Sequence, residues 1–218
     1  MSISVISAIY GPYDTVKPVM EQTVPVDDWI MVTDDIDVSY DAAHKGWEVV
    51  FEPRPHMHPC MAAKIPKFNP ELYVESDYAL WVDASFTYEP TMAQMAMDAL
   101  EWGEIALFPH PHRTTIEAEA ELSLTLPKYA HLPLREQVKH YKNDGFEDTK
   151  LWATGVMAYS LGAHMRSEIG NAWLAECARW SYQDEISFPY VMRKYWQAPV
   201  PIGESQFTSP HVHLGGHI

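Results

Sequence analysis

The chain has 218 residues, of which 47% are hydrophobic, so it can bury one full core and is not a disordered protein. Its formal charge of -15 disfavours nucleic-acid binding, and its two cysteines are too few for a disulfide framework. The sequence has no signal-peptide pattern and no apolar run that could span a membrane, which predicts a soluble, cytoplasmic protein.

The N-terminal part of the chain has the pattern of three strands. β-branched and aromatic residues predict strands over 2–10, 29–33 and 47–51. Asp34 and Asp35 directly follow the second strand, where an acid in a nucleotide-binding α/β fold commonly accepts hydrogen bonds from a ribose or base. A simple Asp-rich turn explains these two residues equally well.

A short helical pattern over 60–68 precedes the next strand, and we expect Pro66 to break it. It carries Lys64 and Lys67, which in so acidic a chain are candidates to face a phosphate group. Lysines on a solvated helix face are the commoner arrangement.

The run over 78–82 is apolar and ends in Asp83, which predicts a central strand with an acid at its carboxyl end. Ser85 lies two residues further on. Together these hard oxygens are suited to hold Mg²⁺ or Mn²⁺ against a diphosphate. The alternative is an aspartate that only caps a turn.

The middle of the chain continues the alternation of strand and helix. Apolar residues from Met92 to Leu100 at helical spacing predict an amphipathic core helix. A strand over 105–108 then leads to His110, His112 and Arg113, with Glu117 in the helix behind them, and we expect these polar residues to contact a sugar or phosphate. As a metal pair the histidines lack a third ligand nearby in sequence.

The last third adds a helix over 134–141, a strand over 151–159 and two further helices. The strand contains Thr154 and Gly155, and a glycine inside a strand indicates close approach of a ligand or of backbone. Asp184 and Glu185 begin the final helix, either as favourable N-terminal charge or as acids presented to a site. The Pro- and Gly-rich tail carries three histidines that either return to the site or fray: His211, His213 and His217.

These motifs occur together in an order that resembles the glycosyltransferase-like family formerly called DUF616, which includes plant mucilage- and pollen-related proteins. The matching segments are 8–14, 32–35, 64–68, 80–85, 112–120, 141–145 and 184–188. The resemblance implies a GT-A-type α/β fold, a Rossmann-like and mainly parallel sheet flanked by helices. It also implies a single domain over 1–218, with a nucleotide-sugar half over 1–110, an acceptor half over 111–196 and a tail over 197–218.

The resemblance also implies roles for individual residues. The implied donor-binding residues are Ala8, Tyr10, Gly11, Asp34, Asp35, Lys64, Lys67, Asp83, Ala84 and Ser85. The implied acceptor-side residues are His110, His112, Arg113, Glu117, Thr154 and Gly155. Asp184 and Glu185 stand where the family has an Asp-Gln pair and are the implied catalytic acids. Because the motif Asp-Ala-Ser lacks a second acid, the expected metal ligands are Asp83, Ser85, His211 and His213.

The sequence therefore predicts a hexosyl- or pentosyltransferase that moves a sugar from a nucleotide sugar to a hydroxyl. A UDP-sugar is the favoured donor, Mn²⁺ or Mg²⁺ is the expected cofactor, and the acceptor is a glycan, protein, lipid or modified nucleobase. Two alternatives stay open, a metal-dependent hydrolase and a non-catalytic nucleotide-sugar-binding module.

Overall fold

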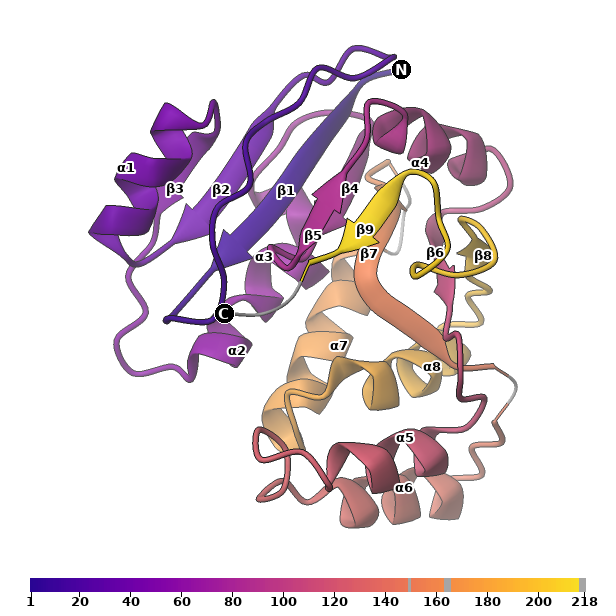
Figure 1. Ribbon diagram of the computed structural model, residues 1–218. Helices are drawn as coiled ribbons and strands as arrows, with labels where there is room; N and C mark the ends of the chain where they lie inside the picture. The colour runs from indigo at the N-terminus through magenta and orange to yellow at the C-terminus, as the bar shows by residue number, and fades with distance from the viewer. Residues whose placement is uncertain (149, 163–165, 216–218) are drawn as a thin grey trace.

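The computed structural model describes residues 1–148, 150–162 and 166–215, and His217 lies outside them. A seven-stranded sheet crosses the molecule in the order β3-β2-β1-β4-β7-β6-β8 (Figure 1). Its strands, in that order, are β3 (Glu48–Phe51), β2 (Trp29–Thr33), β1 (Ile3–Ile9), β4 (Tyr78–Val82), β7 (Trp152–Ser160), β6 (Ile105–Pro109) and β8 (Val200–Pro201). Only β7 runs antiparallel to its neighbours, so the expected mainly parallel sheet is confirmed.

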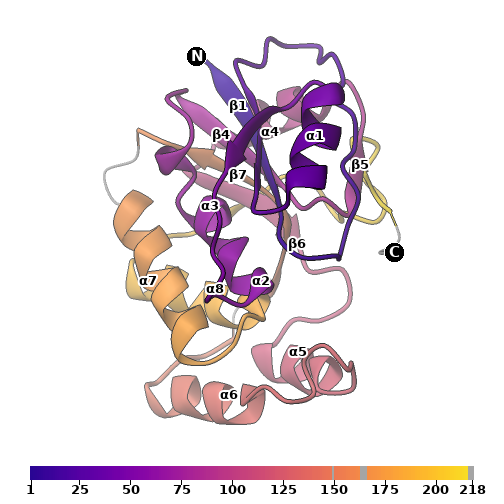
Figure 2. The ribbon, with the colours of Figure 1, turned by 90° about the vertical axis from the view of Figure 1, so that its left-hand side faces the viewer.

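Helices cover both faces of the sheet, so its central strands β1, β4 and β7 are buried on both sides (Figures 1 and 2). Along β4, Ala79 and Trp81 join one hydrophobic core, while Leu80 and Val82 join the other. One face packs against α1 (Ile36–His44), α4 (Met92–Leu100) and a small sheet of β5 (Phe86–Tyr88) and β9 (Val212–Leu214).

The opposite face carries the larger helical layer. It contains α2 (Pro59–Ala62), α3 (Lys64–Phe68), a 3-10 turn (Pro70–Leu72), α5 (Ile116–Ser123), α6 (Leu134–Asn143), α7 (Arg166–Arg179) and α8 (Asp184–Lys194). Figure 2 shows α5 and α6 stacked beyond α8, away from the sheet. The strands of the two predicted halves, β4 and β7, pair directly in one sheet.

The expected break at Pro66 falls elsewhere. The helical pattern is interrupted at Ala63, and α3 continues through Pro66 at its third residue. A proline in the first turn removes no intrahelical hydrogen bond, because the N–H groups there have no partner within the helix. As a result Lys64 and Lys67 lie on one short helix, three residues apart and on the same face.

Among the described residues, no helix is both long enough and apolar enough to cross a membrane.

Candidate functional site

A cavity of about 580 Å³ opens at the carboxyl ends of β1 and β4, the edge where parallel α/β sheets place their ligands. Ala8 and Tyr10 from β1 and its loop line one side, and the segment 83–85 after β4 lines another. Lys64, at the start of α3, also reaches its wall. Six of the ten predicted donor-binding residues therefore meet around a single cavity: Ala8, Tyr10, Lys64, Asp83, Ala84 and Ser85.

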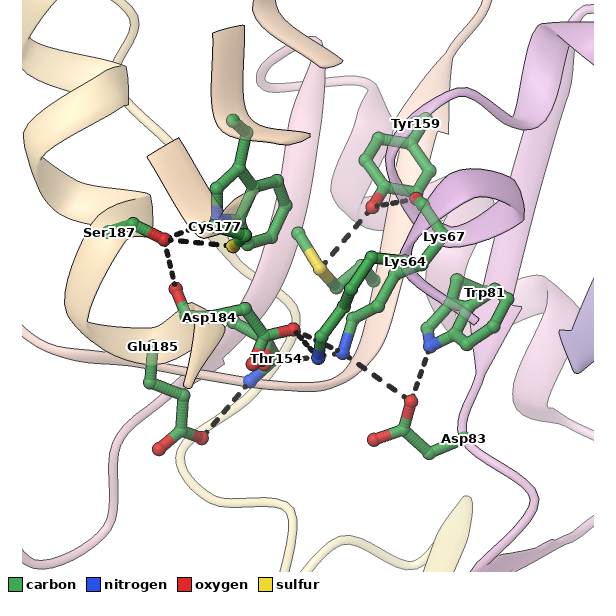
Figure 3. Close-up of polar contacts among 12 residues, drawn as sticks. Lys64, Lys67, Trp81, Asp83, Thr154, Tyr159, Cys177, Asp184, Glu185 and Ser187 are labelled. Atoms are coloured by element: carbon green, nitrogen blue, oxygen red, sulfur yellow. Dashed lines mark hydrogen bonds and ion pairs between the residues drawn. The ribbon is translucent and has the colours of Figure 1, made fainter. Parts of the chain in front are cut away.

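Lys64 and Lys67 share one buried carboxylate, that of Asp184 (Figure 3). The Nζ atoms lie 2.6 and 2.9 Å from Asp184 Oδ2. Burial alone would raise the pKa of the Asp184 carboxyl, but the two ammonium groups outweigh it and hold that pKa well below its usual range. Asp184 is therefore ionised at neutral pH and too weak a base to take a proton from an acceptor.

Lys67 also links Asp184 to Asp83, the acid at the end of β4. Its Nζ lies 3.4 Å from Asp83 Oδ1 and 3.3 Å from Thr154 Oγ1, and the Thr154 hydroxyl donates to Asp184 Oδ1 at 3.1 Å. Asp83 Oδ1 also accepts a hydrogen bond from Trp81 Nε1 at 2.6 Å. The backbone N–H of Asp83 donates to the Gly155 carbonyl, which extends the β4–β7 ladder by one residue and fixes the position of the acid.

Glu185 lies beside Thr154 on the flank away from Asp83, and its Oε1 accepts a hydrogen bond from the Thr154 backbone N–H at 3.4 Å (Figure 3). Burial, together with the nearby carboxylates of Glu119 and Asp184, raises the pKa of the Glu185 carboxyl to about 8. A carboxyl with a pKa near neutrality can exchange protons at working pH, which Asp184 cannot do.

His110, Glu119 and Glu185 form a group whose metal-capable atoms all lie within 4.8 Å of one another. The guanidinium of Arg113 contacts both Glu119 and His110 Nε2, and Gln183 donates to Glu119 at 2.9 Å. His110 Nδ1 accepts the Arg113 backbone N–H. Burial and Arg113 lower the pKa of His110 to about 4. These contacts occupy ligand atoms of His110 and Glu119 and place the cationic Arg113 side chain beside them.

Several predicted site residues lie away from the cavity. Asp34 and Asp35 follow β2 outside the cavity lining, and Asp35 caps α1 by accepting from the Asp37 N–H at 2.8 Å. Glu117 is exposed and pairs with Lys142 at 2.5 Å. The ring of His112 stacks on Phe207, with centroids 5.7 Å apart.

Two of the tail histidines, His211 and His213, also lie away from the cavity and contact other residues. His211 Nδ1 lies 2.7 Å from the Thr91 hydroxyl, and His213 Nε2 lies 3.1 Å from Glu89 Oε1. Neither histidine lines the cavity that holds Asp83. Pairing of β9 with β5 turns the tail back along the small sheet, so the structure does not bring these histidines to the expected metal ligands.

Gly11 and Gly155 have backbone roles. Gly11 has a φ of 71°, a left-handed conformation that favours glycine, in the loop after β1. A Cβ on Gly155 would lie 2.6 Å from Cε2 of Phe86, so the close approach that the sequence indicated is made by a buried ring.

We expect Gly155→Ala to destabilise the protein by about 1–3 kcal/mol, because the added methyl group overpacks the core at Phe86. Equilibrium unfolding in urea measures the change. Gly162→Ala is the matched control, since a Cβ there meets no atom of the described residues within 4 Å. A Gly155→Ala protein as stable as the parent would contradict this account of the glycine.

One wall of the cavity consists of residues that were not predicted from the sequence. The loop segment 127–131 and Tyr182 close it, and the rings of Tyr182 and His58 stack with centroids 4.6 Å apart. The Tyr182 hydroxyl donates to the Lys128 carbonyl at 2.7 Å, which holds the loop in place. Of the residues in this wall, Lys128 could have been chosen from the sequence as a candidate, because it is a lysine in an acidic chain.

A mostly parallel sheet with helices on both faces and an acid at its carboxyl edge defines the class of open α/β proteins, which bind ligands at that edge. Solved transferase structures share this fold. Mouse xyloside xylosyltransferase 1, in its apo form, has a TM-score of 0.53 at 8% identity, over 95% of this chain and 86% of its own. Glucosyl-3-phosphoglycerate synthase from Mycobacterium tuberculosis, solved with Mn²⁺, UDP and glucosyl-3-phosphoglycerate, has a TM-score of 0.51 at 16% identity, over 93% and 70%.

The profile of one protein family, described as TOD1/MUCI70, glycosyltransferase-like domain, matches residues 1–203. The chain therefore belongs to this glycosyltransferase-like family, and the resemblance seen in the sequence is confirmed. No curated protein sequence matches the chain significantly.

Proposed function

We propose that this protein transfers a sugar from a nucleotide-sugar donor, bound in the cavity at the ends of β1 and β4, to a hydroxyl acceptor. The observation that carries the proposal is the meeting of Asp83 and Lys64 at the wall of that cavity, at the carboxyl edge of the sheet. Membership of a glycosyltransferase-like family supports the reaction class.

The cavity suits an anionic donor although the chain as a whole is acidic. Lys64 and Lys128 line it, and their charges attract a diphosphate that the net charge of -15 would otherwise repel. A UDP-sugar is the donor that we favour, since a structure of the same fold was solved with UDP. Named relatives in fold include a xylosyltransferase and a glucosyl-3-phosphoglycerate synthase, so pentosyl and hexosyl donors are both to be tested.

We assign proton transfer to Glu185 and a positioning role to Asp184. As a carboxylate, Glu185 accepts the proton of the acceptor hydroxyl, while the acceptor oxygen forms a bond to the anomeric carbon of the donor sugar. The bond between that carbon and the diphosphate oxygen breaks, and its electron pair leaves with the nucleoside diphosphate. Lys64 faces the added negative charge, and Asp184 holds Lys64 in place.

The expected Mn²⁺ or Mg²⁺ would offset the charge of the same leaving group if it were bound. The donor set for it consists of the Asp83 carboxylate and the Ser85 hydroxyl, and Asp83 Oδ1 already accepts from Trp81 and Lys67. With an ammonium group 3.4 Å from that oxygen, these residues do not fit a divalent cation. No step described above uses one.

A screen of UDP-, GDP- and ADP-sugars by thermal shift and by release of nucleoside diphosphate tests the proposed function. We expect Asp83→Asn to weaken donor affinity about tenfold or more, because the carboxylate at the cavity wall loses its charge and Lys67 loses a partner. The melting temperature should change little, since Asp83 is 38% exposed.

Asp98→Asn, on the exposed side of α4, is the matched control and should bind the donor like the parent. Equal donor affinity in Asp83→Asn and the parent would remove Asp83 from the site. Donor binding without transfer to any acceptor or to water would instead indicate the non-catalytic module.

A further inference from the structure

The acid at the end of β4 is already paired with an ammonium group, that of Lys67, whose Nζ lies 3.4 Å from Asp83 Oδ1. Lys67 is only 3% exposed, and its ammonium group faces the same Asp83 Oδ1 atom that accepts the hydrogen bond from Trp81. Ser85, two residues further, offers only a hydroxyl, so the motif supplies one carboxylate. Among the described residues, the group able to hold a metal by three side chains is His110, Glu119 and Glu185, which excludes Asp83.

The charges of this network balance without any added ion. Lys64 and Lys67 supply two positive charges, and Asp83 and Asp184 supply two negative charges. A divalent cation on Asp83 Oδ1 would lie next to the Lys67 ammonium, and the two positive charges repel each other. An incoming diphosphate instead meets the Lys64 ammonium at the cavity wall, which attracts it.

The lysines are also held rigidly before any ligand binds. The Lys67 carbonyl accepts a hydrogen bond from Tyr159 at 2.8 Å, and the Lys67 ammonium lies 5.8 Å from the Trp81 ring centroid. Lys64 is 14% exposed and anchored to Asp184 at 2.6 Å. Fixed charges that need no reorganisation stabilise a developing negative charge most effectively.

We propose that the pair Lys64 and Lys67 replaces the divalent cation, so that this protein binds and activates the diphosphate of its donor without a metal. The inference rests on the proposed function and goes beyond it, because it states what neutralises the leaving group. Lys64 contacts the diphosphate, while Lys67 neutralises Asp83 from behind. The Asp83 carboxylate is then available to a hydroxyl of the donor.

Isothermal titration calorimetry of the full chain with UDP tests this, once in EDTA and once with Mn²⁺ in place of EDTA. We expect the two affinities to agree within about threefold. Lys64→Met should weaken UDP binding about 10- to 100-fold in EDTA, the range expected for losing a charged hydrogen bond. Lys64→Arg should retain most of the affinity, because the charge is kept.

Lys142→Met is the matched control, because Lys142 forms an exposed ion pair with Glu117. This variant should bind UDP like the parent. Lys64→Met leaves Asp184 paired with Lys67 and is expected to fold, which its melting temperature verifies. Binding of UDP only in Mn²⁺ would overturn the inference and leave the proposed function intact. Absence of UDP binding in both conditions, together with no response to the other nucleotide sugars, would overturn the proposed function and the inference with it.

Discussion

Replacing Asp184 by asparagine is expected to lower the free energy of unfolding by about 3–5 kcal/mol, the largest stability effect that we predict. Asp184 is buried, and its carboxylate is shared by Lys64 and Lys67 at 2.6 and 2.9 Å. Without that charge, two ammonium groups stay in the interior with one partner acid, Asp83, at the edge of the cavity. Equilibrium unfolding in guanidinium chloride measures the loss.

The double variant Asp184→Asn/Lys67→Met should recover part of the lost stability, because it also removes one of the two stranded charges. It also keeps the test informative if the single variant does not fold. Glu121→Gln is the matched control: the Glu121–Arg135 pair is exposed, and its loss should leave the free energy of unfolding almost unchanged. An Asp184→Asn protein within about 1 kcal/mol of the parent would refute the buried-pair account.

The pairing of Asp184 with the two lysines also predicts that the protein loses stability at acid pH. The folded pKa of the Asp184 carboxyl lies below its ordinary value of 3.8, so the unfolded chain binds the proton first as the pH falls. The stabilisation from Asp184 is therefore present above about pH 4 and is lost as the pH falls further. In Asp184→Asn this part of the acid destabilisation should be missing.

Replacing Glu185 by glutamine is expected to reduce turnover about 10²- to 10⁴-fold, the usual contribution of a general base, with little change in donor affinity. In the parent, the turnover rate should rise with pH as Glu185 ionises and level off above about pH 8. The residual activity of Glu185→Gln should lack this rise. Steady-state kinetics over pH 5 to 9, at saturating donor, measures both effects.

The raised pKa of Glu185 also predicts a pH dependence of stability. Its pKa is about 8 in the folded protein and ordinarily 4.5, so the folded protein retains a proton that the unfolded chain has lost. Stability should therefore fall as the pH rises from about 4.5 to 8, and Glu185→Gln should flatten that decline. Glu136→Gln, at an exposed position of α6, is the control. Turnover of Glu185→Gln within tenfold of the parent would remove this residue from the reaction.

Much of the fold could be predicted because its strands are short apolar segments bounded by polar residues. The strands expected over 29–33, 47–51 and 105–108 differ from the observed β2, β3 and β6 by one residue at most at either end. α1 was not predicted, since only Ala42 is fully buried in it and its apolar pattern is weak. The antiparallel direction of β7 was also beyond the sequence, because a buried strand has the same composition in either direction.

Some residues of the candidate site could likewise be predicted from the sequence, and others could not. Asp83, Lys64 and Lys67 could be chosen from the sequence because a strand-end acid and cations in an acidic chain are local signals. The different roles of Asp184 and Glu185 could not be predicted, because these two neighbouring acids differ mainly in the side chains that the fold places around them. Likewise, the wall over 127–131 is a loop without a motif, and the fold alone places it at the cavity.

By itself, the sequence determined the α/β class, the acid at the end of β4 and the family to which the chain belongs, because these depend on residues close together along the chain. Only the tertiary structure decided that Asp184, 120 residues after Lys64, neutralises the lysine pair, and that His211 and His213 bind at the small sheet. Charge balance and pKa values depend on distances between side chains. Those distances are fixed only when β4, β7, α3 and α8 pack together.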